Sequence, residues 1–172
     1  PDEYTKASAR RDLRLRESET VLLFFGGLRK EKGISFLLQS LKKYNGPEFT
    51  LLIAGPEAHV SSEDIEKARS DINIPLRYDS GYIKESEKYF IASDGIICPY
   101  MRSFGRERTS HIFQEAIMSR RPVICPNFGS FQSKLDQYEL GLLFQPEHKG
   151  DLRNTIQKFV ANPDECYSEQ HM

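Results

Sequence analysis

The fold of this chain is constrained most strongly by short, uninterrupted apolar runs that end at glycine or proline. The first run is Val21–Phe25, which stops at Gly26. Similar runs occupy 49–56, 95–98 and 122–125. A strand that is apolar on both faces is typical of a parallel sheet covered by helices on both sides. The runs therefore predict buried parallel strands.

Helical patterns alternate with these strands. One helix carries Ile34, Leu37 and Leu41 on a single face. Six alternations at spacings suited to right-handed crossovers predict a doubly wound, Rossmann-like α/β fold, with a parallel sheet of about six strands and helices on both faces. The remaining expected elements are strands at 74–78 and 141–144, and helices at 65–70, 84–92, 131–138 and 151–160, with one more helix that starts at Thr109 or Ser110.

Composition gives no support to a nucleic-acid partner or a membrane span. The chain has 172 residues, a formal net charge of −1 and 28% charged residues, so its charge balance gives no reason to expect nucleic acid as a partner. It has neither a signal-peptide pattern nor an apolar run near the roughly 18 residues of a membrane span. We expect a cytoplasmic protein.

Cysteine usage agrees with a reducing compartment. There are three cysteines, and two of them, Cys98 and Cys125, fall inside predicted buried strands. No Cys/His cluster has the spacing of a metal site, and no Asp-x-Asp pair is available for a divalent cation.

The chain divides into three predicted parts. Residues 1–20 are highly charged and are expected to form a linker or entry helix, 21–162 to form the α/β domain, and 163–172 to form a polar tail. Because the sequence opens at Pro1 without an initiating methionine, we expect it to be part of a larger protein.

The loop after the first strand is a candidate phosphate site. Gly26 and Gly27 would let the backbone approach a phosphate closely, and Lys32 or Arg29 could supply the opposite charge. A double glycine followed by basic residues is also an ordinary loop between a strand and a helix, so this pattern leaves both interpretations open.

The stretch 100–127 forms a strand–loop–helix–strand unit and is the predicted centre of the site. In an open α/β sheet the ligand crevice lies beyond the carboxyl ends of the strands, where helix N-termini attract anions. Two glutamates, Glu107 and Glu115, have seven residues between them. Glu115 would lie on the flank of the apolar face of its helix and could accept two hydroxyl hydrogen bonds. Alternatively, Glu107 is a first-turn glutamate favoured by the helix dipole and Glu115 is simply solvated.

Taken in serial order, these segments resemble a known family. The segments are 24–33, 51–56, 81–83, 92–99, the two glutamates, 115–124 and 141–144. Together they resemble the C-terminal domain of the group 1 retaining glycosyltransferases, which have the GT-B fold. The resemblance covers roughly 20–160 and lies in the order of the segments more than in any single motif.

The resemblance implies a role for each candidate residue. The domain would hold a nucleotide-diphosphate sugar, with Glu115 on the ribose hydroxyls and Glu107, as the catalytic residue, facing the transferred sugar. The diphosphate would meet Lys32, Arg29 and the helix N-terminus, where Arg108, Thr109 and Ser110 lie, and the backbone of Gly81, Tyr82 and Ile83 would lie against the base. Fixed cations would replace a metal, so no metal or other cofactor is expected.

The resemblance also implies partners. An N-terminal domain of the same protein would bind the acceptor, which would be a glycan, a lipid or a protein, and this chain alone would transfer nothing. Peripheral association of the full-length enzyme with a membrane is compatible with this interpretation. No nucleic-acid partner is implied.

Two departures from the family pattern leave a second function open. Where the family has Gly-Arg-Leu, this chain has Gly27 followed directly by Leu28, and where the family has Glu-Gly-Phe-Gly, it has 107–110, Glu-Arg-Thr-Ser. A non-catalytic α/β interaction module that has kept the architecture and lost the ligand is therefore the alternative.

Overall fold

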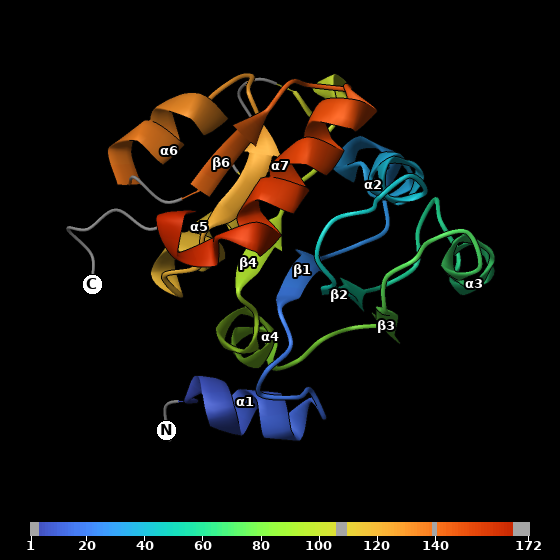
Figure 1. Ribbon diagram of the computed structural model, residues 1–172, viewed down its shortest axis with the longest axis vertical. Coiled ribbons are helices and arrows are strands. Elements are labelled where there is room, and N and C mark those ends of the chain that lie inside the picture. The colour runs from blue at the N-terminus through green and yellow to red at the C-terminus, as the bar shows by residue number, and fades with distance from the viewer. Residues whose placement is uncertain (1–3, 106–109, 139–140, 167–172) are drawn as a thin grey trace.

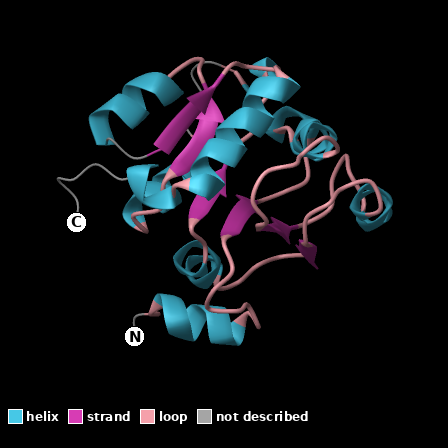
Figure 2. Ribbon diagram, in the orientation of Figure 1, coloured by secondary structure: helices cyan, strands magenta, loops and turns pink. Residues whose placement is uncertain are grey.

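The six predicted strands form one parallel sheet. The computed structural model describes residues 4–105, 110–138 and 141–166. The strands are β1 (Val21–Phe25), β2 (Thr50–Gly55), β3 (Leu76–Ser80), β4 (Gly95–Ile97), β5 (Val123–Pro126) and β6 (Gly141–Phe144). Their order across the sheet is β3-β2-β1-β4-β5-β6, and every neighbouring pair is parallel (Figures 1 and 2). The doubly wound fold predicted from sequence is confirmed.

Helices cover both faces of the sheet. They are α1 (Lys6–Asp12), α2 (Ile34–Leu41), α3 (Ser62–Arg69), α4 (Ser86–Ala92), α5 (His111–Met118), α6 (Phe131–Tyr138) and α7 (Lys149–Ala161), with 3-10 turns η1 (Lys30–Lys32), η2 (Arg102–Phe104) and η3 (Pro163–Cys166). One core cluster joins α2, α3 and α7 to the sheet, and a second joins α1, α4, α5 and α6 to the opposite face.

Alternating strand residues supply the two cores. In β1, Leu22 and Phe24 belong to the α2/α3/α7 cluster, whereas Val21 and Leu23 belong to the other. All four are at most 1% exposed. This two-sided burial is why the run is continuously apolar rather than alternating.

Element boundaries differ from the sequence prediction by one or two residues in most cases. The clearest shift is in β3, which was expected at 74–78 and lies at Leu76–Ser80. Pro75 explains the shift, because proline has no N–H to give to the ladder and the strand begins after it. Ser61 caps α3 by accepting from the Asp64 N–H, and of the two candidate caps for α5 the structure shows Ser110.

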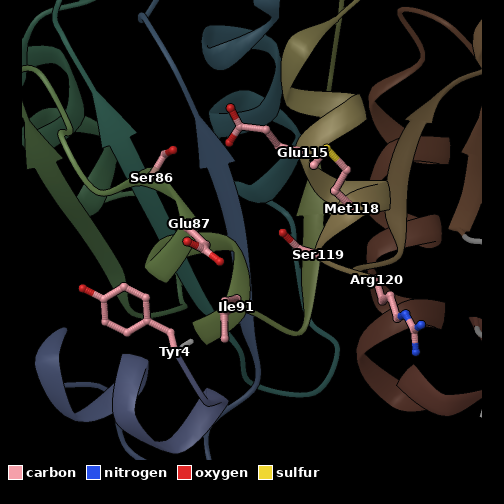
Figure 3. Close-up of a pocket in the computed structure, with 8 residues that line it drawn as sticks. All are labelled: Tyr4, Ser86, Glu87, Ile91, Glu115, Met118, Ser119 and Arg120. Carbon is pink, nitrogen blue, oxygen red and sulfur yellow. The ribbon is translucent and has the colours of Figure 1, made fainter. Parts of the chain in front are cut away.

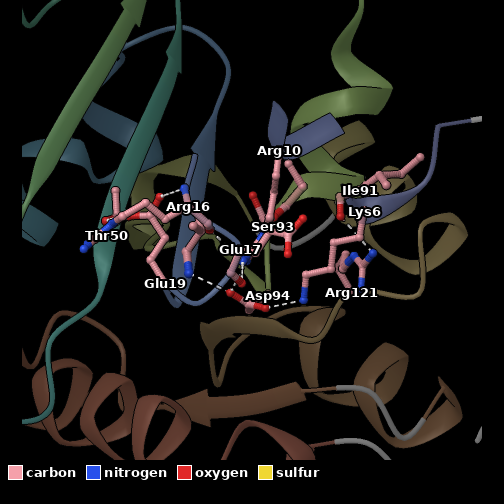
Figure 4. Close-up of polar contacts among 12 residues, drawn as sticks. Lys6, Arg10, Arg16, Glu17, Glu19, Thr50, Ile91, Ser93, Asp94 and Arg121 are labelled. Atoms are coloured by element: carbon pink, nitrogen blue, oxygen red, sulfur yellow. Dashed lines mark hydrogen bonds and ion pairs between the residues drawn. The ribbon is translucent and has the colours of Figure 1, made fainter. Parts of the chain in front are cut away.

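The entry segment packs into the same core as the rest of the chain. Ala9 and Leu13 of α1 are buried, and Arg10, at 3% exposed, is buried as well. The Arg10 guanidinium donates to the Ala92 carbonyl at 2.9 Å and to the Asp94 carboxylate at 2.8 Å (Figure 4). Asp94 also accepts from the Val21 N–H at 2.7 Å, at the start of β1.

We predict that Asp94→Ala lowers the free energy of unfolding by about 2–3 kcal/mol. The substitution leaves the Arg10 guanidinium buried without its carboxylate and removes the acceptor of the Val21 N–H. Urea denaturation followed by circular dichroism measures the change. The control is Lys67→Ala in the exposed Lys67–Glu63 pair, whose loss should cost at most about 1 kcal/mol. Equal losses for the two variants would show that the Arg10–Asp94 contact does not anchor α1.

Candidate functional site

The order of the strands reverses between β1 and β4. From β1 the chain winds outward through β2 and β3, and from β4 it winds the other way through β5 and β6. In open α/β sheets this switch point is where the loops at the carboxyl ends diverge and ligands bind. The segments that meet here are the loop after β1, which holds Gly26 and Lys32, and the loop after β4, which begins at Cys98.

Gly26 lies directly against the Lys32 ammonium. A Cβ added to Gly26 would be 2.7 Å from Lys32 Nζ and 3.9 Å from the Cδ1 atom of Ile112, in the first turn of α5. Gly26 also has φ +106°, a conformation that residues with side chains rarely adopt. The structure therefore brings together the glycine, the lysine and the start of α5.

The Lys32 side chain is half-buried without a carboxylate partner among the described residues. Burial lowers the pKa of the Lys32 ammonium from its usual value, and the positive charge of Arg29 lowers it further, whereas Cys98 and Glu31 oppose the shift. Arg29 itself is largely exposed, and its Nη1 atom lies 3.9 Å from the Glu31 carboxylate. An unneutralised, partly desolvated cation at the end of β1 is well suited to binding an anion.

The loops after β1 and β4 are fastened to each other. A Cβ on Gly33 would lie 1.7 Å from the Pro99 carbonyl oxygen, so only glycine allows this approach. Met101 N–H donates to the Glu31 carbonyl at 2.9 Å. These contacts were not predicted, because they join two loops that lie far apart in the sequence and meet only in the folded chain.

Ser110 holds the N-terminus of α5 in place. Its hydroxyl accepts from the Phe113 N–H at 3.3 Å and forms a 2.7 Å hydrogen bond with the hydroxyl of Tyr100. Tyr100 is 2% exposed and stacks on Phe104 with 4.4 Å between the ring centroids. Burial raises the pKa of Tyr100 well above its usual value. The Ser110 side chain is thus already satisfied, and the groups left to meet a ligand at this end of α5 are first-turn backbone N–H groups.

Glu115 lies on the flank of α5, as predicted, and is half-buried. It lines a hollow of about 710 Å³ together with Ser86 and Glu87 from the start of α4, Ile91 and the exposed Met118 (Figure 3). The hollow runs along α4 and α5 and does not include Lys32 or Gly26 among its lining residues. The α4 residues were not anticipated, because helix-start Ser and Glu are ordinary first-turn residues in sequence.

The residues predicted to meet the base follow β3. Gly81 has φ +97° and donates from its N–H to the Gly55 carbonyl at 3.2 Å. Tyr82 is 89% exposed, whereas Ile83 packs partly against the core. Of these three residues, Tyr82 therefore has the most exposed side chain.

The other predicted site residues divide into two groups. Gly27 does not have a positive φ, and the nearest atom to a Cβ there would be 3.8 Å away, so its backbone does not require glycine. Glu107, Arg108 and Thr109 lie outside the described residues, and their predicted roles are not tested by the structure.

Two general properties of the described residues bear on the site. Among them, no group of three or more His, Cys, Asp or Glu side chains could hold a metal ion. None of the described helices has the length and apolar character needed to cross a bilayer.

A family model described as "Glycosyl transferases group 1" matches residues 5–170. The chain belongs to this family. The match includes α1, in agreement with the packing of that helix into the core. No curated protein matches the sequence.

Several solved structures have the same fold. A sucrose-phosphate synthase from Thermosynechococcus elongatus is 26% identical with a TM-score of 0.76, over 95% of this chain and 41% of that one. HepE from Anabaena, solved in complex with UDP and glucose, is 17% identical with a TM-score of 0.73, over 94% of this chain and 44% of that one. The C-terminal domain of LpcC from Francisella tularensis is 20% identical with a TM-score of 0.68, over 97% and 87%. The chain therefore spans about two fifths of the first two proteins.

We predict different effects for alanine at the two adjacent glycines. Gly26→Ala should lower the free energy of unfolding by about 1–3 kcal/mol, because it forces a side chain into φ +106° and displaces Lys32 Nζ. Gly27→Ala should change it by less than about 1 kcal/mol. Thermal denaturation of both variants measures the difference. Equal stabilities would show that the Gly26 backbone carries no strain penalty.

Proposed function

We propose that this chain is the donor-binding domain of a retaining glycosyltransferase, which holds a nucleotide-diphosphate sugar at the β1/β4 switch point. The observation that carries the proposal is the half-buried Lys32 ammonium, which lies against Gly26 and the start of α5 without a carboxylate partner among the described residues. Membership of the group 1 family supports a transferase, and the UDP-glucose complex of HepE shows this type of ligand in a protein of the same fold.

The chemistry of the proposed reaction fits these groups. Cleavage of the bond between sugar and diphosphate leaves negative charge on the diphosphate, and Lys32, Arg29 and the α5 N-terminus would stabilise it without a metal. Charge-assisted hydrogen bonds contribute about 1.5–3 kcal/mol each, more than the roughly 0.3–1 kcal/mol of the helix dipole. In this proposal Glu115 accepts the ribose hydroxyls, Glu107 faces the sugar, and Tyr82 lies beside the base.

The rest of the enzyme would come from an N-terminal domain. The chain spans 41% and 44% of the sucrose-phosphate synthase and HepE chains, which leaves room for a second domain of similar size. That domain would bind the acceptor, a glycan, a lipid or a protein, and transfer would require both halves. We place the enzyme in the cytoplasm, with peripheral contact to a membrane where the acceptor is a lipid.

The first test is the melting temperature of the chain with UDP, GDP, ADP, CMP and their sugars, each with and without EDTA. A ligand at 100 times its dissociation constant adds about 2.7 kcal/mol, which should raise the melting temperature by roughly 5–10 °C in a domain of this size. We expect one nucleotide class to stabilise the chain, with no effect of EDTA. The stabilisation should be lost in Glu115→Ala and kept in Glu66→Ala, which removes an exposed carboxylate from α3.

Two results would contradict this proposal. If Glu115→Ala kept the full shift, Glu115 would not be a ribose ligand. If none of the nucleotides shifted either this chain or the two-domain protein, the alternative of a non-catalytic interaction module would be correct.

We also predict that affinity for the nucleoside diphosphate falls at alkaline pH. Because burial lowers the Lys32 pKa in the free domain, the ammonium loses its proton below the pH at which an exposed lysine would. Affinity should be constant below this lowered pKa and fall as the pH rises through it. Lys32→Arg keeps its charge over this range, so its profile should lack that decline while retaining any titration of the ligand itself. Isothermal titration across pH measures both profiles. Identical profiles would exclude Lys32 as the phosphate ligand.

A further inference from the structure

A second concave surface lies between α2 and α7, away from the proposed donor site. It has a volume of about 560 Å³. Four of its six lining residues are cationic and none is acidic: it is lined by Gln39, Lys42, Lys43, Lys149, Gly150 and Arg153. The chain as a whole has a net charge of −1, so this surface concentrates positive charge that the overall composition does not show.

Most of this positive charge is not neutralised. Lys42 pairs with Asp71 at 2.7 Å. Within the described part of the chain, Lys43, Lys149 and Arg153 lie within ion-pair distance of no carboxylate. Asp151 lies between Lys149 and Arg153 in the sequence of α7. Its carboxylate accepts from the Gln145 N–H at 2.5 Å. Three cations therefore face one hollow without a fixed counterion.

The backbone at the start of α7 adds to the same surface. His148 Nδ1 accepts the Asp151 N–H at 2.9 Å and so caps this 13-residue helix. The N–H groups of the two residues before Asp151 point out of the N-terminal end of the helix. Gly150 has no side chain to cover them, and a Cβ there would be 3.8 Å from the Arg153 guanidinium. The positive end of α7 and the cations thus act on the same space.

We propose that this hollow binds a multiply charged oxyanion of the phosphate class. Lys43 and Lys149 supply point charges from opposite walls, Arg153 supplies a planar pair of donors that matches two phosphate oxygens, and Gln39 supplies an amide. The site is separate from the proposed donor site, because Gln39 lies in the last turn of α2 and Lys42 and Lys43 follow that helix, whereas Lys32 precedes it. The proposal does not depend on the function proposed above.

The test titrates the ¹⁵N-labelled chain with sodium pyrophosphate at pH 7 and follows the backbone amides of 39–43 and 149–153. The triple variant Lys43→Gln, Lys149→Gln, Arg153→Gln removes the site. The control is Arg11→Gln, Arg69→Gln, Lys158→Gln, which removes the same charge from exposed positions elsewhere. A parallel arm measures co-sedimentation with vesicles of phosphatidylglycerol and phosphatidylcholine, compared with phosphatidylcholine alone.

We expect saturable shifts of these amides in the wild-type chain and in the control, with affinity reduced at least about tenfold in the site variant. Pyrophosphate binding with this pattern identifies the ligand as a free phosphorylated solute. Binding to anionic vesicles alone, lost only in the site variant, identifies it as a lipid headgroup. The proposal is wrong if neither probe binds, if binding shifts no amide of 39–43 or 149–153, or if the site variant and the control weaken binding at these amides equally.

Discussion

The parallel pairing of β1 with β4 is the constraint on which the site depends. These strands are neighbours in the sheet although they are separated by two intervening strands in the chain, so the loops that leave their carboxyl ends run to opposite sides. Gly33 then lies against the Pro99 carbonyl, and Met101 bonds to the Glu31 carbonyl. These contacts fix the positions of both loops before any ligand arrives.

The main electrostatic consequence is that Lys32 lies in a half-buried environment that disfavours the charge of its ammonium. The ammonium is partly removed from water and no described carboxylate lies within ion-pair distance of it, so the folded protein carries the cost of partial desolvation. An anion that replaces the lost water would relieve that cost. In the proposed function, stability in this region is traded for binding, a balance often found where positive charge is positioned in advance.

The sequence was most informative where hydrophobic burial determines structure. Val21–Phe25 is apolar throughout because both of its faces are covered, and this pattern predicted the strand within its observed bounds. Lys32 and Gly26 were also recognised, because glycine and lysine after a first strand have a chemical rationale. The hydrogen bond between Tyr100 and Ser110 was not predicted, since a partner ten residues away depends on how the loop folds back. The β3 start was placed two residues early, because the apolar Ile74 outweighed the effect of Pro75.

The buried Arg10 has a consequence for engineering. Its guanidinium donates to the Ala92, Arg16 and Glu17 carbonyls and to Asp94, so α1 is held by groups contributed by its own following turn and by the α4–β4 junction. A chimaera joined at residue 20, where composition suggests a linker, would leave the Ala92 carbonyl and the Asp94 carboxylate without Arg10 and the face of α4 uncovered. Exchange of this domain between glycosyltransferases should instead use a junction that precedes Thr5, so that α1 travels with the sheet it covers.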